Sequence, residues 1–72
     1  MNTFLKYSLE KQKKIRVVLL LDGQLVQKNA VVVSLTDTEA ALRISGKKEP
    51  LTVSLDDILS CDYARGDHGE DE

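Results

Sequence analysis

The 72-residue sequence lacks most of what catalysis, metal binding or a disulfide framework requires. It has one cysteine, Cys61, so no intramolecular disulfide can form, which favours a reducing, cytoplasmic compartment. Its one histidine, His68, lies in a terminal stretch of Gly, Asp and Glu, and no Ser or Cys lies in a nucleophile motif. We therefore expect a protein that is not an enzyme, with no catalytic residue, metal ligand set, cofactor or small-molecule substrate.

Long hydrophobic runs are also missing. The longest uncharged apolar run, residues 17–21, is far short of the roughly 20 residues that span a bilayer. Residues 1–6 do not show the basic region followed by an apolar stretch that marks a secretory signal. We expect neither a membrane partner nor secretion.

What remains is the composition of one small soluble domain, with 42% hydrophobic and 31% charged residues. Aromatic residues are few, because the chain has one Phe, two Tyr and no Trp. A domain of this size buries only roughly 60% of the surface that its unfolded chain exposes. We expect a partner or a second copy to add to its stability.

The charges are unevenly distributed along the chain. Residues 66–72 hold four of the twelve acidic residues and no Lys or Arg, so residues 1–65 carry ten bases against eight acids, a net +2. We therefore predict a folded domain over residues 1–65 and a disordered acidic tail over residues 66–72. The tail is interpreted either as a solubilising terminus or as a segment that competes with nucleic acid for a basic surface.

Hydrophobic spacing predicts a helix followed by strands. Residues 3–12 show one helical face, made of Phe4, Leu5, Ser8, Leu9 and Gln12, and Asn2 or Thr3 can cap the helix. From Ile15 onward the period changes to two, which predicts strands at 15–21, 25–35, 40–45, 51–55 and 58–63. The dipeptide Asp22-Gly23 is typical of a hairpin turn.

Five short strands cannot leave a flat sheet with two exposed apolar faces, and curling the sheet buries one face. We predict a mainly β fold, an N-terminal helix followed by a five-stranded antiparallel small barrel. Its predicted core includes Val17, Leu19, Val32, Leu42, Ile44, Val53 and Ile58. The alternative is a sheet that dimerises or exchanges a strand, because Val18, Leu20, Val31 and Val33 are apolar residues on the opposite face.

The order of several motifs resembles the Sm-like family, and in particular its bacterial RNA chaperones of the Hfq type. The matching features are Phe4-Leu5 at the helix start, the basic helix end at 11–14, the strand end at 20–23 and the segment at 53–58. The resemblance implies an Sm-like barrel that forms a ring and binds RNA. Other small barrels, including the WYL domain with its acidic turn before the last strand, share much of this pattern.

The departures from the family concern its RNA sites. Before Ile58 the chain has Ser54-Leu55-Asp56-Asp57, where the family has a Tyr-Lys-His-Ala run that lines its uridine-binding pore. Two carboxylates there would repel phosphate. Asp56 and Asp57 are interpreted as a turn or cap rather than as a metal or acid–base site. Lys28 lies near the place of a glycine that lets the family's second strand bend, which puts the barrel's closure in question.

Two functions follow as hypotheses. The first is an oligomeric assembly or protein-interaction module, a homo-oligomer formed through sheet edges. The alternative is weak RNA binding of low specificity through a lateral basic patch. The candidate residues of that patch are Lys11, Lys13, Lys14 and Arg16, joined by Lys47 and Lys48. The sequence pI of about 5.3 and the scarcity of aromatic residues weigh against the alternative.

Overall fold

The polypeptide alternates short elements with tight turns. The computed structural model describes residues 2–64, and the predicted acidic tail lies outside the described residues. The elements are α1 (Asn2–Lys11), β1 (Ile15–Leu21), β2 (Gln24–Leu35), β3 (Glu39–Ile44), β4 (Leu51–Ser54), the short 3-10 helix η1 (Leu55–Asp57) and β5 (Ile58–Tyr63). No helix within residues 2–64 has the length and apolarity needed to cross a membrane.

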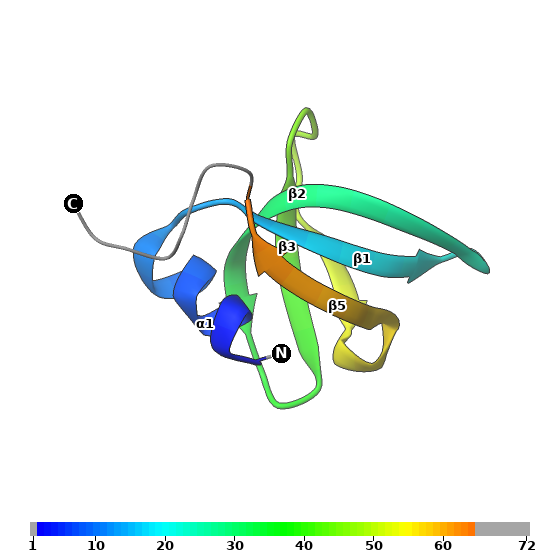
Figure 1. Cartoon of the computed structure of the whole chain (residues 1–72), viewed down its shortest axis with the longest axis horizontal. Helices are drawn as coiled ribbons and strands as arrows, with labels where there is room; N and C mark the ends of the chain where they lie inside the picture. Colours follow the sequence, from blue (N-terminus) through cyan, green and yellow to red (C-terminus); the bar gives the residue numbers. More distant parts are fainter. Residues whose placement is uncertain (1, 65–72) are drawn as a thin grey trace.

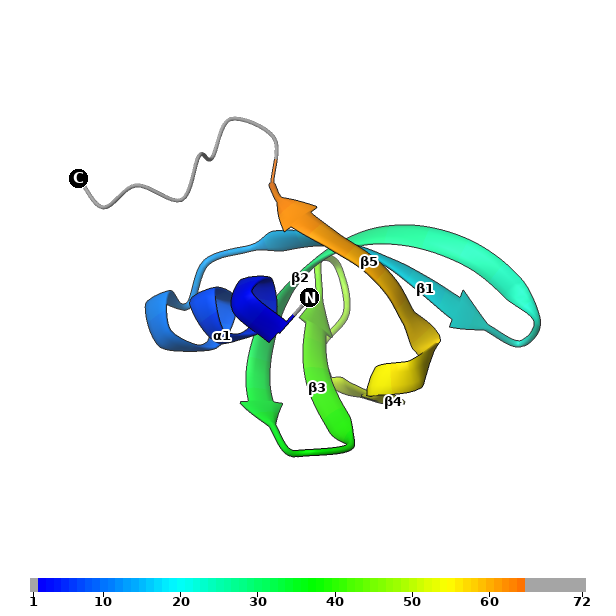
Figure 2. The ribbon, with the colours of Figure 1, turned by 60° about the horizontal axis from the view of Figure 1, so that its bottom comes forward.

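The five strands form one antiparallel sheet in the order β4-β3-β2-β1-β5 (Figure 1). This confirms the prediction of a mainly β fold with an N-terminal helix. The sheet is strongly bent, as the two ribbon views show (Figure 2). Its first and last strands in this order, β4 and β5, do not pair with each other, so the barrel is open between them.

The turn between β1 and β2 depends on two residues with positive φ angles, whereas the bend of β2 depends on a β-bulge. Asp22 and Gly23 have φ angles of 51° and 78°, the left-handed pair that a two-residue hairpin turn needs, as the sequence predicts. In β2, which has no glycine, Val33 is an extra residue between the pairs Val32↔Leu42 and Ser34↔Ala41. Such a bulge bends a strand, so the curvature of β2 does not require glycine.

The concave face of the sheet holds the core. Every predicted core residue is buried, and Leu5, Ile15, Ala30 and Ala40 join them. Two leucines of the strand predicted at 51–55 lie outside this core. Leu51 is 36% exposed at the start of β4, and Leu55 lies half-buried in η1 because the strand ends one residue earlier, at Ser54.

Helix α1 covers the part of β2 that β1 leaves unpaired. The pairing of β1 with β2 ends at Ile15↔Ala30, so the later half of β2 lacks a strand on that side. There the Val32 N–H donates to Ser8 Oγ (2.9 Å), and Gln12 Nε2 donates to the Val32 carbonyl (3.3 Å). Ser8 Oγ in turn donates to the Lys13 carbonyl (2.7 Å). Two polar side chains of the helical segment thus replace a missing strand.

Candidate functional site

The sheet ends in two open backbone edges, which are the outer edges of β4 and β5. Each strand pairs on one side only, β4 with β3 and β5 with β1. Within residues 2–64, no other segment forms backbone hydrogen bonds with these outer edges. A strand edge of this kind presents N–H and C=O groups that can pair with another chain.

An exposed leucine accompanies each edge. In β5, Leu59 is an extra residue between the pairs Val18↔Ser60 and Leu19↔Ile58, and it is 48% exposed. In β4, Leu51 is 36% exposed. Leu25 is more exposed, at 66%, but it lies in the β1–β2 hairpin and not on an edge strand.

The apolar outer face that the sequence predicts is only partly accessible. Val18, Val31 and Val33 are half-buried, and Leu20 is 39% exposed. The residual apolar surface therefore lies mainly at the hairpin and along the edges rather than across the middle of the sheet.

The predicted basic patch divides into two groups. Lys11 ends α1, and Lys13 and Lys14 link it to β1, where all three side chains are exposed. Arg16 is the second residue of β1, and its guanidinium pairs with the Asp62 carboxylate of β5 at 3.3 Å. This partner reduces the positive charge that Arg16 can offer to a phosphate.

Lys47 and Lys48 belong to the second group. Ile15, Ala30 and Ile44 form one row across β1, β2 and β3. β1 and β3 run in the same direction, since each is antiparallel to β2, so Lys14 precedes this row while Lys47 follows it. The two groups of lysines therefore extend from opposite sides of the row.

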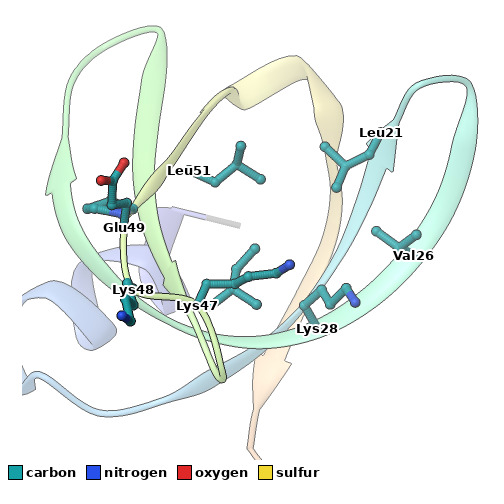
Figure 3. A pocket seen from close by; sticks show the side chains of 9 residues that line it. Leu21, Val26, Lys28, Lys47, Lys48, Glu49 and Leu51 are labelled. Carbon is teal, nitrogen blue, oxygen red and sulfur yellow. The ribbon is translucent and has the colours of Figure 1, made fainter.

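Lys47 and Lys48 lie instead with Lys28 around a pocket of about 660 Å³ (Figure 3). The pocket opens at the end of the barrel away from α1, and Leu21, Val26, Ile44, Pro50 and Leu51 supply its apolar lining, with Glu49 beside them. Sequence reasoning did not find this site. The available signal was the alternation in β2 that places Lys28 on the same face as buried Ala30.

The acidic pair before β5 forms a turn. Asp56 and Asp57 lie in η1, and the Asp56 N–H donates to Ser54 Oγ at 3.2 Å, so Ser54 caps the turn as an N-cap. Among residues 2–64, no group of three or more His, Cys, Asp or Glu side chains could hold a metal ion.

All aromatic rings of the chain gather at one place. Phe4 and Tyr7 of α1 each contact Tyr63 of β5 edge to face, with ring centroids 4.8 Å and 5.3 Å apart. These are the single Phe and both Tyr of the sequence. The rings attach the helix to the last strand, and none lies beside the pocket lysines.

Comparisons of the chain with family models, curated proteins and solved structures give no match. The resemblance to the Sm-like family therefore stays a prediction from sequence.

Proposed function

We propose that this domain is an assembly module, in which the outer edge of β4 in one copy pairs with the outer edge of β5 in the next. The observation that carries the proposal is that one bent sheet has an open edge at each of its two ends. Pairing would satisfy the backbone groups of both edges and would cover Leu51 and Leu59.

An interface between two different edges has a specific consequence. Each added copy uses one free edge and contributes another, so association continues until the set closes on itself as a ring or extends as a filament. The bend of the sheet favours closure (Figure 2). We place the module in a reducing, cytoplasmic compartment, because its cysteine is single.

RNA binding is the second candidate, and the exposed group Lys11, Lys13 and Lys14 favours it. It ranks below assembly for two reasons. Arg16 already pairs with Asp62, and the three aromatic rings pack helix against strand, where they would have to be displaced to stack fully on bases.

The assembly proposal is tested by measuring mass with light scattering over a range of protein concentrations. The wild-type chain should exceed its monomer mass of 8.0 kDa. Thr52→Lys on β4 and Leu59→Lys on β5 place a charge at one edge each, on exposed positions that the fold tolerates. Each variant alone should stay close to monomeric.

Mixing the two variants is the decisive step. Thr52→Lys keeps an intact β5 edge and Leu59→Lys keeps an intact β4 edge, so the mixture should form a heterodimer and nothing larger. Leu25→Lys, which removes a more exposed leucine away from both edges, is the matched control and should associate like wild type. A wild-type mass of one chain at high micromolar protein, or a mixture that stays monomeric, would overturn the proposal.

A further inference from the structure

We propose that the open end of the barrel is a binding site for an amphipathic anion, a flexible alkyl chain that ends in a carboxylate. The inference does not rest on the assembly proposal, because the pocket lies within one copy, although Leu51 takes part in both. It concerns binding without turnover, since the residues that line the pocket include no nucleophile or general base beyond lysine and one glutamate.

The two ends of the barrel differ in how they are closed. At one end α1 packs Leu5 and Ser8 into fully buried positions. At the other end no helix or strand of residues 2–64 covers the concave face, and the pocket of about 660 Å³ opens there. Its volume lies within the range of roughly 300–1,000 Å³ that is usual for small-molecule sites, and barrel mouths are common places for them.

The interior of this pocket offers apolar contact. Leu21, Val26, Ile44 and Leu51 face it from four different strands, and Ile44, only 7% exposed, is the deepest of them. β1 and β2 pair with each other along the pocket, whereas β3 pairs with β2 only from Ala30 onward, so within residues 2–64 the first half of β2 has no strand on its β3 side. The apolar lining favours an alkyl chain, which buries no polar group that would need a partner.

The rim of the pocket, unlike its interior, carries charged side chains. Lys28, Lys47, Lys48 and Glu49 belong to the pocket lining, and Figure 3 shows the Lys47 amine extending toward Lys28 while the Lys48 amine points away from the cavity. Within residues 2–64, none of the three lysines has a carboxylate within ion-pair distance. The two cations at the mouth, Lys28 and Lys47, repel each other beside an apolar cavity, and one anionic head group would relieve that repulsion.

Calorimetric titration of the full chain tests the proposal, with decanoate and decylamine below their micelle concentrations and decanol below its solubility limit. Decanoate should bind most tightly and decylamine least. Over the series hexanoate, octanoate and decanoate, affinity should rise about fourfold per added methylene until the cavity is full, which is the increment expected for burying each CH₂. Added salt should lower the affinity for decanoate and leave the affinity for decanol unchanged.

Variants separate the head-group contact from the cavity. The double variant Lys28→Gln with Lys47→Gln should lower the affinity for decanoate roughly two- to thirtyfold, as expected for losing two exposed charge contacts. The affinity for decanol should not change. Val26→Trp should fill the cavity and abolish binding of both, while amide spectra verify that the sheet is intact. Lys13→Gln with Lys14→Gln is the matched control and should bind like wild type.

Three results would overturn the proposal. These are equal affinity for decanoate and decylamine, decanoate binding that survives Val26→Trp, and amide shifts that fall outside the pocket residues. Binding of an acidic, leucine-rich peptide in place of decanoate would assign the pocket to a protein partner and would equally overturn it.

Discussion

Ser8 links three segments through one hydroxyl, since it accepts from the Val32 N–H and donates to the Lys13 carbonyl. Ser8 and Val32 are both fully buried, so the Val32 N–H cannot turn to water if the hydroxyl is lost. The residue therefore fixes where the helix lies on β2 and where the chain turns into β1.

Ser8→Ala is expected to lower the free energy of unfolding by about 1–3 kcal/mol, the cost of a buried donor left without an acceptor. Hydrogen exchange should locate the effect, with faster exchange at the Val32 amide than at amides of the β1–β2 hairpin. If Val32 exchanges at the wild-type rate, Ser8 does not hold this bond in solution.

Leu19 provides the corresponding test of the apolar core. Leu19→Ala is expected to cost about 2–4 kcal/mol, because the side chain is fully buried and its loss leaves a cavity. Leu25→Ala removes the same atoms from a side chain that is 66% exposed and should change stability by no more than about 0.5 kcal/mol. Urea denaturation of both variants measures the difference.

Cys61 lies opposite Val17 and is half-buried, and burial raises the pKa of its thiol. As pH rises above about 8.5, the unfolded chain loses this proton before the folded one, so the cysteine's contribution to stability falls with rising pH. We expect slower alkylation by iodoacetamide in the folded protein than in urea at pH 8.5. Cys61→Ala should flatten the decline of stability over this interval.

At the scale of elements, the strands could be predicted from sequence because alternation, turn residues and β-branched side chains agree. The helix was predicted to begin at Thr3 and runs from Asn2 to Lys11, so Thr3, a candidate cap, lies inside it. Gln12 follows in a left-handed conformation, φ 54°. These are the one-residue differences expected where helix ends fray.

The contacts that sequence reasoning missed are non-local. The spacing placed Ser8 on the apolar helix face, but its partner Val32 lies 24 residues further on, so the bond could not be foreseen. The pocket was missed for the same reason, because Leu21, Val26 and Leu51 become neighbours only when the sheet bends. The separation of Lys47 from Lys14 likewise depends on strand direction.

The basic end of α1 gives a prediction for RNA. If RNA binds there, replacing Lys11, Lys13 and Lys14 by Ala should make the plot of log affinity against log salt less steep by roughly 2, since each phosphate contact in single-stranded RNA contributes about 0.7. Lys47→Ala with Lys48→Ala, on the other group, should leave the slope unchanged. Filter binding of pooled RNA measures both, and an unchanged slope in the triple variant would exclude this surface.

At the scale of the whole molecule, the assembly proposal couples stability to concentration. Edge pairing stabilises only folded copies, so the denaturation midpoint of wild type should rise with protein concentration. The double variant Thr52→Lys with Leu59→Lys should show one midpoint at all concentrations. A wild-type midpoint that does not move over a hundredfold dilution would argue against association in this range.

The pairing of β1 with β5 also has a consequence during synthesis, because β1 is made well before its partner β5. β1 is the first strand to be made and β5 the last, and Arg16 and Asp62, which join them, are 46 residues apart in sequence. Until β5 leaves the ribosome, β1 can pair with β2, but the edge of β1 that faces β5 stays open, on a strand that carries apolar Val18 and Leu20. Translation at about 5–20 residues per second leaves that edge open for seconds, a window in which chaperones or neighbouring nascent chains can reach it.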